Sequence, residues 1–369
     1  MITDFDRFAM NRALVLAARG LETTHPNPRV GCVIAQGTKI IGEGWHERAG
    51  QAHAEVAALA SVRAGGAEPA GTTVYVTLEP CSHHGRTPPC VDALVAAGVS
   101  RVVYAVQDPN PQVSGQGAEA LREAGIAVES GLMEAESVDL NIGFMKRMTQ
   151  GRPWVRLKLA MSLDGRTALA NGASQWITGE AARNDVQHWR ARSSAVMTGV
   201  GTVLADDPRL DVRLPPEKPE DEPWQPLRVV LDTRLRTPAD SRLFTTGGDV
   251  LILTEDAMRG AALAEMGVAV EAIPATAGRL DLAAVIDRMG ELEVNELLVE
   301  AGPTLSGEML RQGLVDEVLL YVAPKLLGPQ GLPLVDLPPL SDLQDALGFT
   351  VAGVQRLEDD LRLRLRPRS

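Results

Sequence analysis

Apolar positions in the first 150 residues alternate between helical and strand spacing. Residues 4–19 repeat apolar side chains at the spacing of an amphipathic helix, whereas residues 73–78 (TVYVTL) form the β-branched run of a buried strand. Further helices are expected at 53–64, 88–97, 118–124 and 133–148, and further strands at 31–35, 39–45, 101–106 and 126–129. This alternation predicts an α/β domain whose central sheet is covered by helices on both faces.

The same alternation restarts after the turn signal Gly151-Arg152-Pro153, which marks a domain boundary. A chain of 369 residues is long for one core, so we expect two domains, at 1–149 and 150–369. In the second, strands are expected at 154–161, 195–198, 227–231, 250–254, 296–299 and 317–322, and helices at 180–191, 280–289 and 305–312. The Pro-rich, acidic stretch 214–226 is expected to be a surface loop.

Composition and charge narrow the classes of partner. The formal net charge is −12 and no lysine- or arginine-rich run is present, so we expect no nucleic-acid partner, although a local pocket for one phosphate fits this charge. The N-terminus lacks the cationic start and apolar stretch of a signal peptide, and no run of about 18 apolar residues could span a bilayer, so no membrane partner is expected. Three cysteines cannot form a disulfide framework, which favours a cytoplasmic protein.

The strongest chemical signal is a set of metal-binding residue types. His53 is followed by Glu55, and Cys81 and Cys90 come later in the chain. One imidazole and two thiolates suit zinc and leave a fourth position for water, whose pKa the metal lowers towards neutrality. Glu55, as a carboxylate that does not bind the metal, can then carry the proton. Since positions i and i+2 do not share a helix face, both residues must lie in the first helical turn.

Two features leave alternatives open at this site. In such centres two residues commonly lie between the cysteine ligands, whereas eight residues (SHHGRTPP) lie between Cys81 and Cys90. A closed structural zinc site would need a fourth protein ligand, for which His46, His83 and His84 are candidates.

The second half carries a weaker signal of its own. The strand expected at 195–198 runs into a glycine turn at 199–202, and the strand at 296–299 runs into a second one at 300–304. Two such turns suit a cofactor laid across the carboxyl edge of a sheet, with its phosphates at a helix N-terminus. The third glycine of a dinucleotide fingerprint is absent, so ordinary β-to-α turn chemistry stays open.

Several runs of residues resemble a known family. THPNPRVGCVI, HAEVAAL and VTLEPCSHHGRTPPC resemble the deaminase half of bifunctional riboflavin-biosynthesis enzymes, and KLAMSLDGRTA, SQWITG, GTVLADDPRL, VEAGPTLSGEML and YVAPKLLG resemble the reductase half. The resemblance implies a cytidine-deaminase-like three-layer domain followed by a dihydrofolate-reductase-like domain. It also implies one Zn2+ per chain, NADPH, and a small phosphoribosylated pyrimidine substrate. The expected reactions are deamination of 2,5-diamino-6-(5-phosphoribosylamino)pyrimidin-4-one and reduction of its ribosyl group to ribityl.

The resemblance also implies roles for individual residues. In the deaminase half, the zinc ligands would be His53, Cys81 and Cys90, the proton shuttle Glu55, and the substrate contacts Asn27, His46 and Arg86. In the reductase half, NADPH would contact Ala160, Trp176, Thr202, Asp206, Thr233 and the turn of Gly302, Pro303, Thr304, Leu305, Ser306, Gly307 and Glu308. The substrate there would contact Ser174, Arg190, Leu210, Arg213 and Glu300, with Lys158 and Asp206 assisting proton transfer.

Simpler interpretations of four of these residues remain open. Arg86 could be a solvated loop charge, Asn27 a turn residue between prolines, Lys158 a cap on a sheet edge, and Trp176 a core residue.

The function of the whole chain also has alternatives. It could be a nucleotide or tRNA deaminase with a non-catalytic accessory domain, or a non-catalytic zinc protein. We further expect a homodimer or higher homo-oligomer formed through the C-terminal domain, in which the β-rich segments 314–327 and 349–365 could supply an edge.

Overall fold

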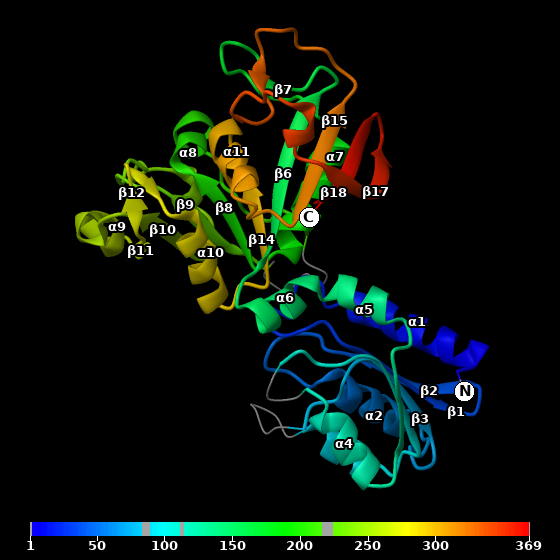
Figure 1. Ribbon diagram of the computed structural model, residues 1–369. Coiled ribbons are helices and arrows are strands. Elements are labelled where there is room, and N and C mark those ends of the chain that lie inside the picture. The colour runs from blue at the N-terminus through cyan, green and yellow to red at the C-terminus, as the bar shows by residue number, and fades with distance from the viewer. Residues whose placement is uncertain (1, 83–88, 111–113, 216–223, 369) are drawn as a thin grey trace. The chain divides into compact units, whose positions relative to one another are not determined.

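The computed structural model describes residues 2–82, 89–110, 114–215 and 224–368 (Figure 1). The chain separates into two compact units, residues 1–151 and residues 152–369. Among the described residues, no helix has both the length and the apolar character needed to cross a membrane.

The first unit is built on a five-stranded sheet with strand order β2-β1-β3-β4-β5. Its strands are β1 (Gly31–Gln36), β2 (Lys39–Trp45), β3 (Thr73–Leu78), β4 (Arg101–Val106) and β5 (Ala127–Ser130). Its helices are α1 (Asp4–Ala18), α2 (Ala54–Ala64), α3 (Cys90–Ala96), α4 (Gln116–Glu123), α5 (Glu134–Leu140) and α6 (Ile142–Gln150). Strand β1 pairs antiparallel with β2 and β3, whereas β3, β4 and β5 run parallel.

Alternate side chains of the central strands fill two cores. Val33 and Tyr75 pack with α1 on one face of the sheet, whereas Ile34 and Val76 pack with α2, α3 and α4 on the other. The predicted arrangement of a sheet covered on both faces is therefore confirmed. Helix α2 lies against β2 at backbone distance, because a Cβ on Gly44 would stand 2.4 Å from the amide nitrogen of Ala58.

One predicted helix of this unit is wrong. The sequence predicts a single helix over 133–148, but the structure has α5 and α6 with a break at Asn141, where φ is −108° and ψ is 20°. The Asn141 side chain binds the backbone of Arg29 instead, accepting from its N–H at 2.8 Å and donating to its carbonyl at 2.9 Å. A tertiary hydrogen bond thus interrupts a stretch whose local pattern is helical.

The second unit contains a nine-stranded sheet with order β11-β10-β9-β8-β14-β6-β15-β18-β17. These strands are β6 (Trp154–Ser162), β8 (Ala195–Gly199), β9 (Leu227–Leu231), β10 (Val250–Thr254), β11 (Ala269–Ala272), β14 (Glu296–Glu300), β15 (Glu317–Ala323), β17 (Phe349–Leu357) and β18 (Asp360–Pro367). The helices are α7 (Glu180–Arg192), α8 (Val200–Asp206), α9 (Ala261–Glu265), α10 (Leu282–Glu291) and α11 (Pro303–Arg311). Two small sheets pair β7 (Arg166–Ala168) with β16 (Leu332–Pro333) and β12 (Ala275–Thr276) with β13 (Arg279–Leu280).

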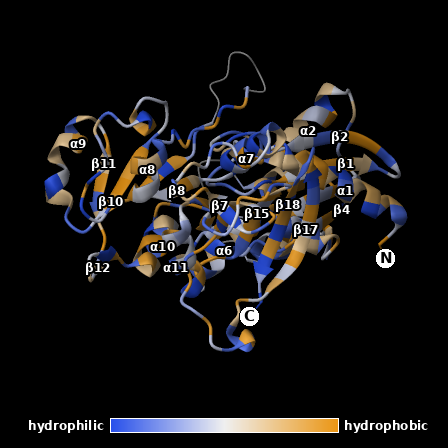
Figure 2. Ribbon diagram, turned by 90° about the horizontal axis from the view of Figure 1, so that it is seen from above, coloured by the Kyte–Doolittle hydropathy of each residue, from blue (hydrophilic) through white to orange (hydrophobic). Residues whose placement is uncertain are grey.

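Helices cover both faces of this larger sheet (Figure 1). Helices α10 and α11 pack on Val155, Leu157 and Val299, whereas α7 packs on Leu298 and Leu319. Strand β10 is buried along its whole length and is hydrophobic from Val250 to Leu253 (Figure 2). The first seven strands in this order, from β11 through β6 to β15, run parallel. The β17–β18 hairpin adds two antiparallel strands at the other edge.

The face of the sheet under α7 buries a network of charges. Arg156, in the central strand β6, donates to Glu317 at 2.6 Å and also binds Glu296; the three side chains are at most 1% exposed. Glu296 also accepts from Arg192 at 2.9 Å, and Glu317 accepts from Arg364 at 2.9 Å. Buried carboxylates are stable only when they are paired with a positive charge. Glu296 of β14 and Glu317 of β15 therefore depend on the arginines that bind them.

Replacing Arg156 with methionine is expected to destabilise the second unit by about 3–5 kcal/mol, because two buried carboxylates lose a partner. Urea unfolding followed by tryptophan fluorescence measures this, since four of the five tryptophans lie in this unit. The matched control is Arg152→Met, whose partner Asp287 is half exposed, for which a loss below about 1 kcal/mol is expected. Equal losses for the two variants would contradict the importance of the buried network.

Candidate functional site

The start of helix α2 presents the first metal-binding residue type. His53 is the N-cap of this helix, with φ −72° and ψ 161°, and no side chain caps the helix there. Glu55 lies in the first turn and is only 3% exposed. The two residues therefore share the first turn of the helix, as their i and i+2 spacing required.

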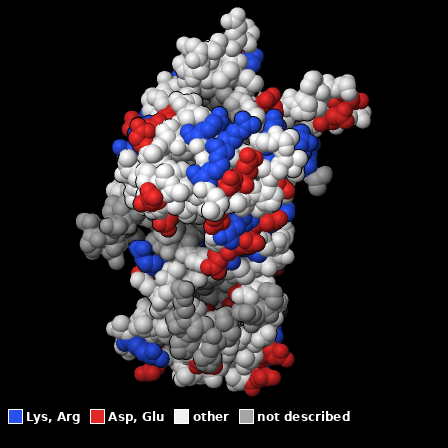
Figure 3. Space-filling view, turned by 90° about the vertical axis from the view of Figure 1, so that its left-hand side faces the viewer, with Lys and Arg blue, Asp and Glu red and all other residues white. Residues whose placement is uncertain are grey.

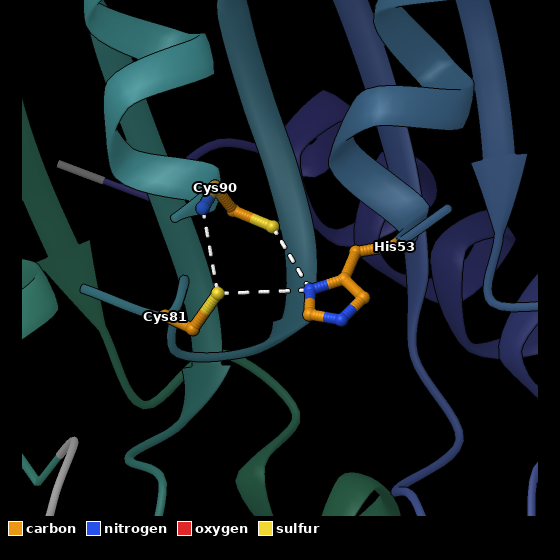
Figure 4. Close-up of side chains that lie close together, drawn as sticks. All are labelled: His53, Cys81 and Cys90. Atoms are coloured by element: carbon orange, nitrogen blue, oxygen red, sulfur yellow. Dashed lines mark hydrogen bonds between the residues drawn. The ribbon is translucent and has the colours of Figure 1, made fainter. Parts of the chain in front are cut away.

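The two cysteines reach the same place from other elements. Cys81 follows the end of β3, and Cys90 is the first residue of α3, which also begins without a side-chain cap. His53 Nδ1 lies 3.2 Å from Cys90 Sγ and 3.6 Å from Cys81 Sγ, and all three ligand atoms lie within 4.8 Å of one another (Figure 4). The eight residues between the cysteines do not prevent this convergence, and the His/Cys/Cys donor set fits Zn2+.

The electrostatics of this group separate the roles of its members. A hydrogen bond from the Cys90 thiol lowers the pKa of Cys81, and the amide of Cys90 also donates to Cys81 Sγ at 3.4 Å. Burial, followed by the negative charge of Cys81, raises the pKa of Glu55 to about 7. A buried carboxyl that titrates near neutrality is suited to accept and return a proton.

His46 and Asn27 lie beside the metal-binding group. The His46 ring stands 5.5 Å from the His53 ring, and its Nδ1 donates to the carbonyl of Ala52 at 3.1 Å. Its Nε2 therefore accepts from Asn27 Nδ2, also at 3.1 Å. Burial lowers the pKa of His46, which favours the neutral ring.

The fourth ligand of a closed zinc site is not found among the described residues. The only group of three or more potential ligands in those ranges is His53, Cys81 and Cys90. Both ring nitrogens of His46 are used by other partners. His83, His84 and Arg86 lie outside the described residues, so their predicted roles stay predictions.

A cavity of about 590 Å³ adjoins the group. Residues 50–53 line it together with Val56, Pro89, Asp92 and Ala93. His53 therefore faces an open space on one side and the two sulfur atoms on another.

In the second unit, three predicted residues form one cluster. Arg190 donates to both oxygens of Glu300, at 2.6 and 3.0 Å, and to the carbonyl of Asp211 at 3.0 Å. Lys158 pairs with Glu300 across β6 and β14, and burial, reinforced by the charge of Arg190, lowers the pKa of this lysine. Burial opposes the charged form of Glu300, but Arg190 and Lys158 outweigh it and lower its pKa. Because β6 is a central strand, the interpretation of Lys158 as a sheet-edge cap is wrong.

The remaining predicted substrate residues lie in different surroundings. Arg213 is exposed and bonds Asp211 at 2.5 Å, whereas Leu210 is 2% exposed with a φ of 55°. Ser174 is half-buried, before the exposed Trp176. Trp176 is 63% exposed, with the Arg183 guanidinium 4.6 Å from its ring centre, so the interpretation of this tryptophan as a core residue is wrong.

Most of the predicted cofactor residues lie at or near the ends of strands. Thr202 and Asp206 lie in α8 directly after β8, Thr233 follows β9, and Ala160 lies in β6 opposite Tyr321. Gly302 is the N-cap of α11, and Pro303, Thr304, Leu305 and Ser306 form its first turn. Gly307 and Glu308 have other partners: a Cβ on Gly307 would stand 2.0 Å from the carbonyl oxygen of Asp336, and Glu308 pairs with Arg311 at 2.5 Å.

Two residues near the sites were missed by sequence reasoning. Tyr321 places its ring 6.0 Å from Lys158 Nζ and donates its hydroxyl to Asp185 at 2.6 Å. Glu79 is 2% exposed although it is acidic and follows directly on an apolar strand. That pattern, a lone carboxylate at the end of a buried run, is the signal that could have identified it.

Comparison with known proteins agrees over nearly the whole chain. Residues 153–363 match the family model of the RibD C-terminal domain, and residues 3–106 match the cytidine and deoxycytidylate deaminase zinc-binding region. The riboflavin biosynthesis protein RibD of Escherichia coli (strain K12) is 49% identical over 370 residues, which cover 98% of this chain and 99% of that protein.

Solved structures show the same similarity. A structure of Acinetobacter baumannii RibD superposes with a TM-score of 0.91 at 45% identity and covers 99% of both chains. A diaminohydroxyphosphoribosylaminopyrimidine deaminase/5-amino-6-(5-phosphoribosylamino)uracil reductase from Thermotoga maritima gives a TM-score of 0.85 at 34% identity, again over 99% of both chains.

The thiols of metal-free protein are expected to differ in reactivity. Iodoacetamide at about pH 6.5 should modify Cys81 before Cys90 and Cys32, because the thiolate is the reacting form and only Cys81 has a lowered pKa. Peptide mass spectrometry after treatment with a chelator gives the three rates. Modification of Cys90 ahead of Cys81 would contradict the assignment of the thiolate.

Proposed function

The chain belongs to the RibD family of riboflavin biosynthesis proteins, and from this membership we propose how its residues divide the work. It is a bifunctional enzyme with a zinc-binding deaminase unit of cytidine-deaminase-like fold and a reductase unit of dihydrofolate-reductase-like fold that uses NADPH. The alternative of a nucleotide or tRNA deaminase with a non-catalytic accessory domain is not favoured, because residues 153–363 match the reductase model. We propose two domains, 1–149 and 150–369; the boundary between the two compact units lies two residues later, after Gly151.

The proposed substrate of the first unit is 2,5-diamino-6-(5-phosphoribosylamino)pyrimidin-4-one. The observation that carries this assignment is the convergence of His53, Cys81 and Cys90 beside the buried Glu55. These three side chains would hold Zn2+, which supplies a water of lowered pKa as the nucleophile. Glu55 would take a proton from that water and return it to the amino group that leaves as ammonia, so that a C–N bond breaks as a C–O bond forms.

Asn27 and His46 would orient the pyrimidine ring. Their side chains form one hydrogen-bonded pair next to His53, and His46 is fixed in turn by the carbonyl of Ala52. Asn27 also donates its backbone N–H to Thr24 at 2.7 Å, so its role in a turn and its role toward the substrate are compatible. Arg86 remains the proposed contact for the ribose phosphate, because a guanidinium binds phosphate through paired donors.

In the second unit, the proposed reaction reduces C1 of the ribosyl group to give a ribityl chain. NADPH supplies the hydride, and Lys158 would supply the accompanying proton. The lowered pKa of Lys158 makes its ammonium a better acid, and Glu300 keeps it oriented across the paired strands. Asp206, which is exposed at the end of α8, is the second proposed participant in proton transfer.

The other reductase contacts follow the strand ends. The proposed NADPH contacts are Ala160, Trp176, Thr202, Asp206, Thr233, Gly302, Pro303, Thr304, Leu305, Ser306, Gly307 and Glu308. Support is strongest for the start of α11, where Gly302 and Thr304 are exposed and the N-cap supplies no side-chain hydrogen bond, and weaker for Gly307 and Glu308, which contact protein groups. The proposed substrate contacts are Ser174, Arg190, Leu210, Arg213 and Glu300.

We propose a homodimer, or a higher homo-oligomer, formed through the C-terminal unit. Strand β17 lies at the edge of the nine-stranded sheet, and its Val351 and Val354 are 63% and 62% exposed. Leu361 on the neighbouring β18 is 41% exposed. An edge strand with exposed apolar side chains favours pairing with a second copy.

We propose that the enzyme works in the cytoplasm on small molecules and binds no nucleic acid. All three cysteines are free, and a thiolate metal site is kept reduced in that compartment. The net charge is −12, and acidic side chains lie among the basic ones on the face in Figure 3, which disfavours a polyanionic partner.

Replacing Glu55 with glutamine is expected to lower kcat for deamination by about 10²–10⁴-fold, because the amide cannot carry the proton. Reduction of pre-deaminated substrate should be unchanged. Assays of ammonia release and NADPH oxidation on the same preparation measure the two reactions. The reciprocal control is Lys158→Met, which should abolish reduction and spare deamination; loss of both reactions in either variant would overturn the division of roles.

Replacing Val354 with aspartate is expected to convert the oligomer to monomers, because a charge would be buried in the new interface. Size-exclusion chromatography with light scattering measures the mass. The control is Met258→Asp, at a residue 87% exposed elsewhere in the unit, which should leave the mass unchanged. A wild-type chain that is monomeric at all concentrations would refute the proposal.

A further inference from the structure

Glu79 is a buried carboxylate that accepts hydrogen bonds from backbone amides after β4 and at the start of α4. Its Oε2 accepts from the N–H of Gly115 at 2.9 Å and of Asp108 at 3.3 Å, and its Oε1 accepts from the N–H of Ala118 at 3.0 Å. The residue is 2% exposed. A buried acid satisfied by three amides is a fixed anchor for the residues that supply them, here Asp108 after β4 and Gly115 and Ala118 at the start of α4.

The anchored segment presses on the residue before Cys81. A Cβ on Gly117 would stand 2.0 Å from the carbonyl oxygen of Pro80, so the first turn of α4 rests directly on the Pro80–Cys81 peptide. The Glu79 N–H meanwhile donates to the carbonyl of Val106 at 3.0 Å, which extends the pairing of β3 with β4. Glu79 and Pro80 are therefore held from two directions.

Cys81 itself is fixed on its other side by α3. The N–H of Val91 donates to the Cys81 carbonyl at 3.2 Å, and the N–H of Cys90 donates to Cys81 Sγ at 3.4 Å. A sulfur clamped between α3 and the Glu79–Pro80 segment cannot shift without breaking one of these contacts.

We propose that Glu79 is a positioning residue of the deaminase site: it holds α4 against Pro80 and thereby fixes Cys81 Sγ relative to His53 and Cys90. The inference rests on the proposed role of Cys81 as a zinc ligand. A carboxylate is needed because three N–H donors require two acceptor oxygens, and the NH2 group of glutamine would face one of them. Replacing a residue that orients a metal ligand typically lowers metal affinity or activity by about 10–100-fold.

The competing role is that of a simple helix cap. Glu79 lies at the N-terminus of α4, where a negative charge stabilises a helix. A cap affects the stability of the fold and leaves the metal site alone. The rate at which zinc leaves the folded protein therefore distinguishes the two roles.

In the full-length chain, Glu79→Gln is expected to speed zinc release to a colorimetric chelator about tenfold and to lower kcat for deamination, while NADPH-dependent reduction stays at the wild-type rate. The matched control is Asp6→Asn, which removes an equally buried carboxylate bonded to Tyr75 at 2.7 Å and to Arg101 at 2.6 Å, at the other end of β4. This control should lower the melting temperature and release zinc at the wild-type rate. Equal acceleration in both variants would overturn the proposal.

A second variant approaches the same contact from α4. Gly117→Ala should also speed zinc release, because its methyl group collides with the Pro80 carbonyl. Its control is Gly65→Ala, where the nearest atoms would be 3.5 Å away and nothing should change. If both Glu79→Gln and Gly117→Ala release zinc at the wild-type rate, the inference is wrong. Cys81→Ser separates this failure from that of the proposed function: if Cys81→Ser binds zinc as the wild type does, the ligand set itself is wrong.

Discussion

The approach of α2 to the β1–β2 hairpin is the constraint on which the deaminase site depends. Glycines at 42 and 44 allow this contact, since a Cβ at either position would lie within 2.7 Å of backbone atoms of α2. A side chain at either position would push α2 away from the sheet, and His53 and Glu55 would move with its first turn. The parallel pairing of β3 with β4 then brings Cys81 to the same edge, where α3 begins with Cys90. Ordinary packing thus assembles the chemistry.

The reductase unit obeys a different constraint, which is charge balance on one face of its sheet. Alternate residues of β6 point under α7, so Arg156 and Lys158 share a face while Val155 and Leu157 belong to the opposite core. Arg156 is neutralised by Glu296 and Glu317, and Lys158 lies beside the Glu300–Arg190 pair. Buried, paired charges on β6 therefore have two roles. Those around Arg156 stabilise the fold, and those around Lys158 belong to the candidate reductase site.

Sequence reasoning succeeded where local pattern and chemistry agreed. The strands of both sheets that carry the sites lie where alternation and β-branched runs placed them, and the requirement that His53 and Glu55 share a first turn is met in α2. It failed where a distant partner decides the outcome. Asn141 breaks a predicted helix because it binds Arg29, which lies 112 residues away in the chain.

Two further features were predicted in part: residues 349–365 were expected to be β-rich, and a glycine turn was expected after residues 195–198. The alternating leucines and arginines of 361–366 have the period of a strand with one charged face, which is what β18 is. The turn expected after β8 is the start of α8, because Gly199 serves as its N-cap. The contacts of Glu79 join three segments, so no local pattern could predict them beyond the oddity of its position.

The uncapped starts of α2 and α3 have a consequence for the order in which the protein comes apart. Helices leave their first amide groups without intrahelical partners, and here neither N-cap residue supplies a side-chain bond. Cys81 Sγ takes one of these amides, that of Cys90, so sulfur does part of the work that serine or aspartate performs elsewhere. His53, Cys81 and Cys90 converge at these two helix ends, so fraying of either end would separate the ligands. Metal loading and local order at this edge therefore form a single equilibrium.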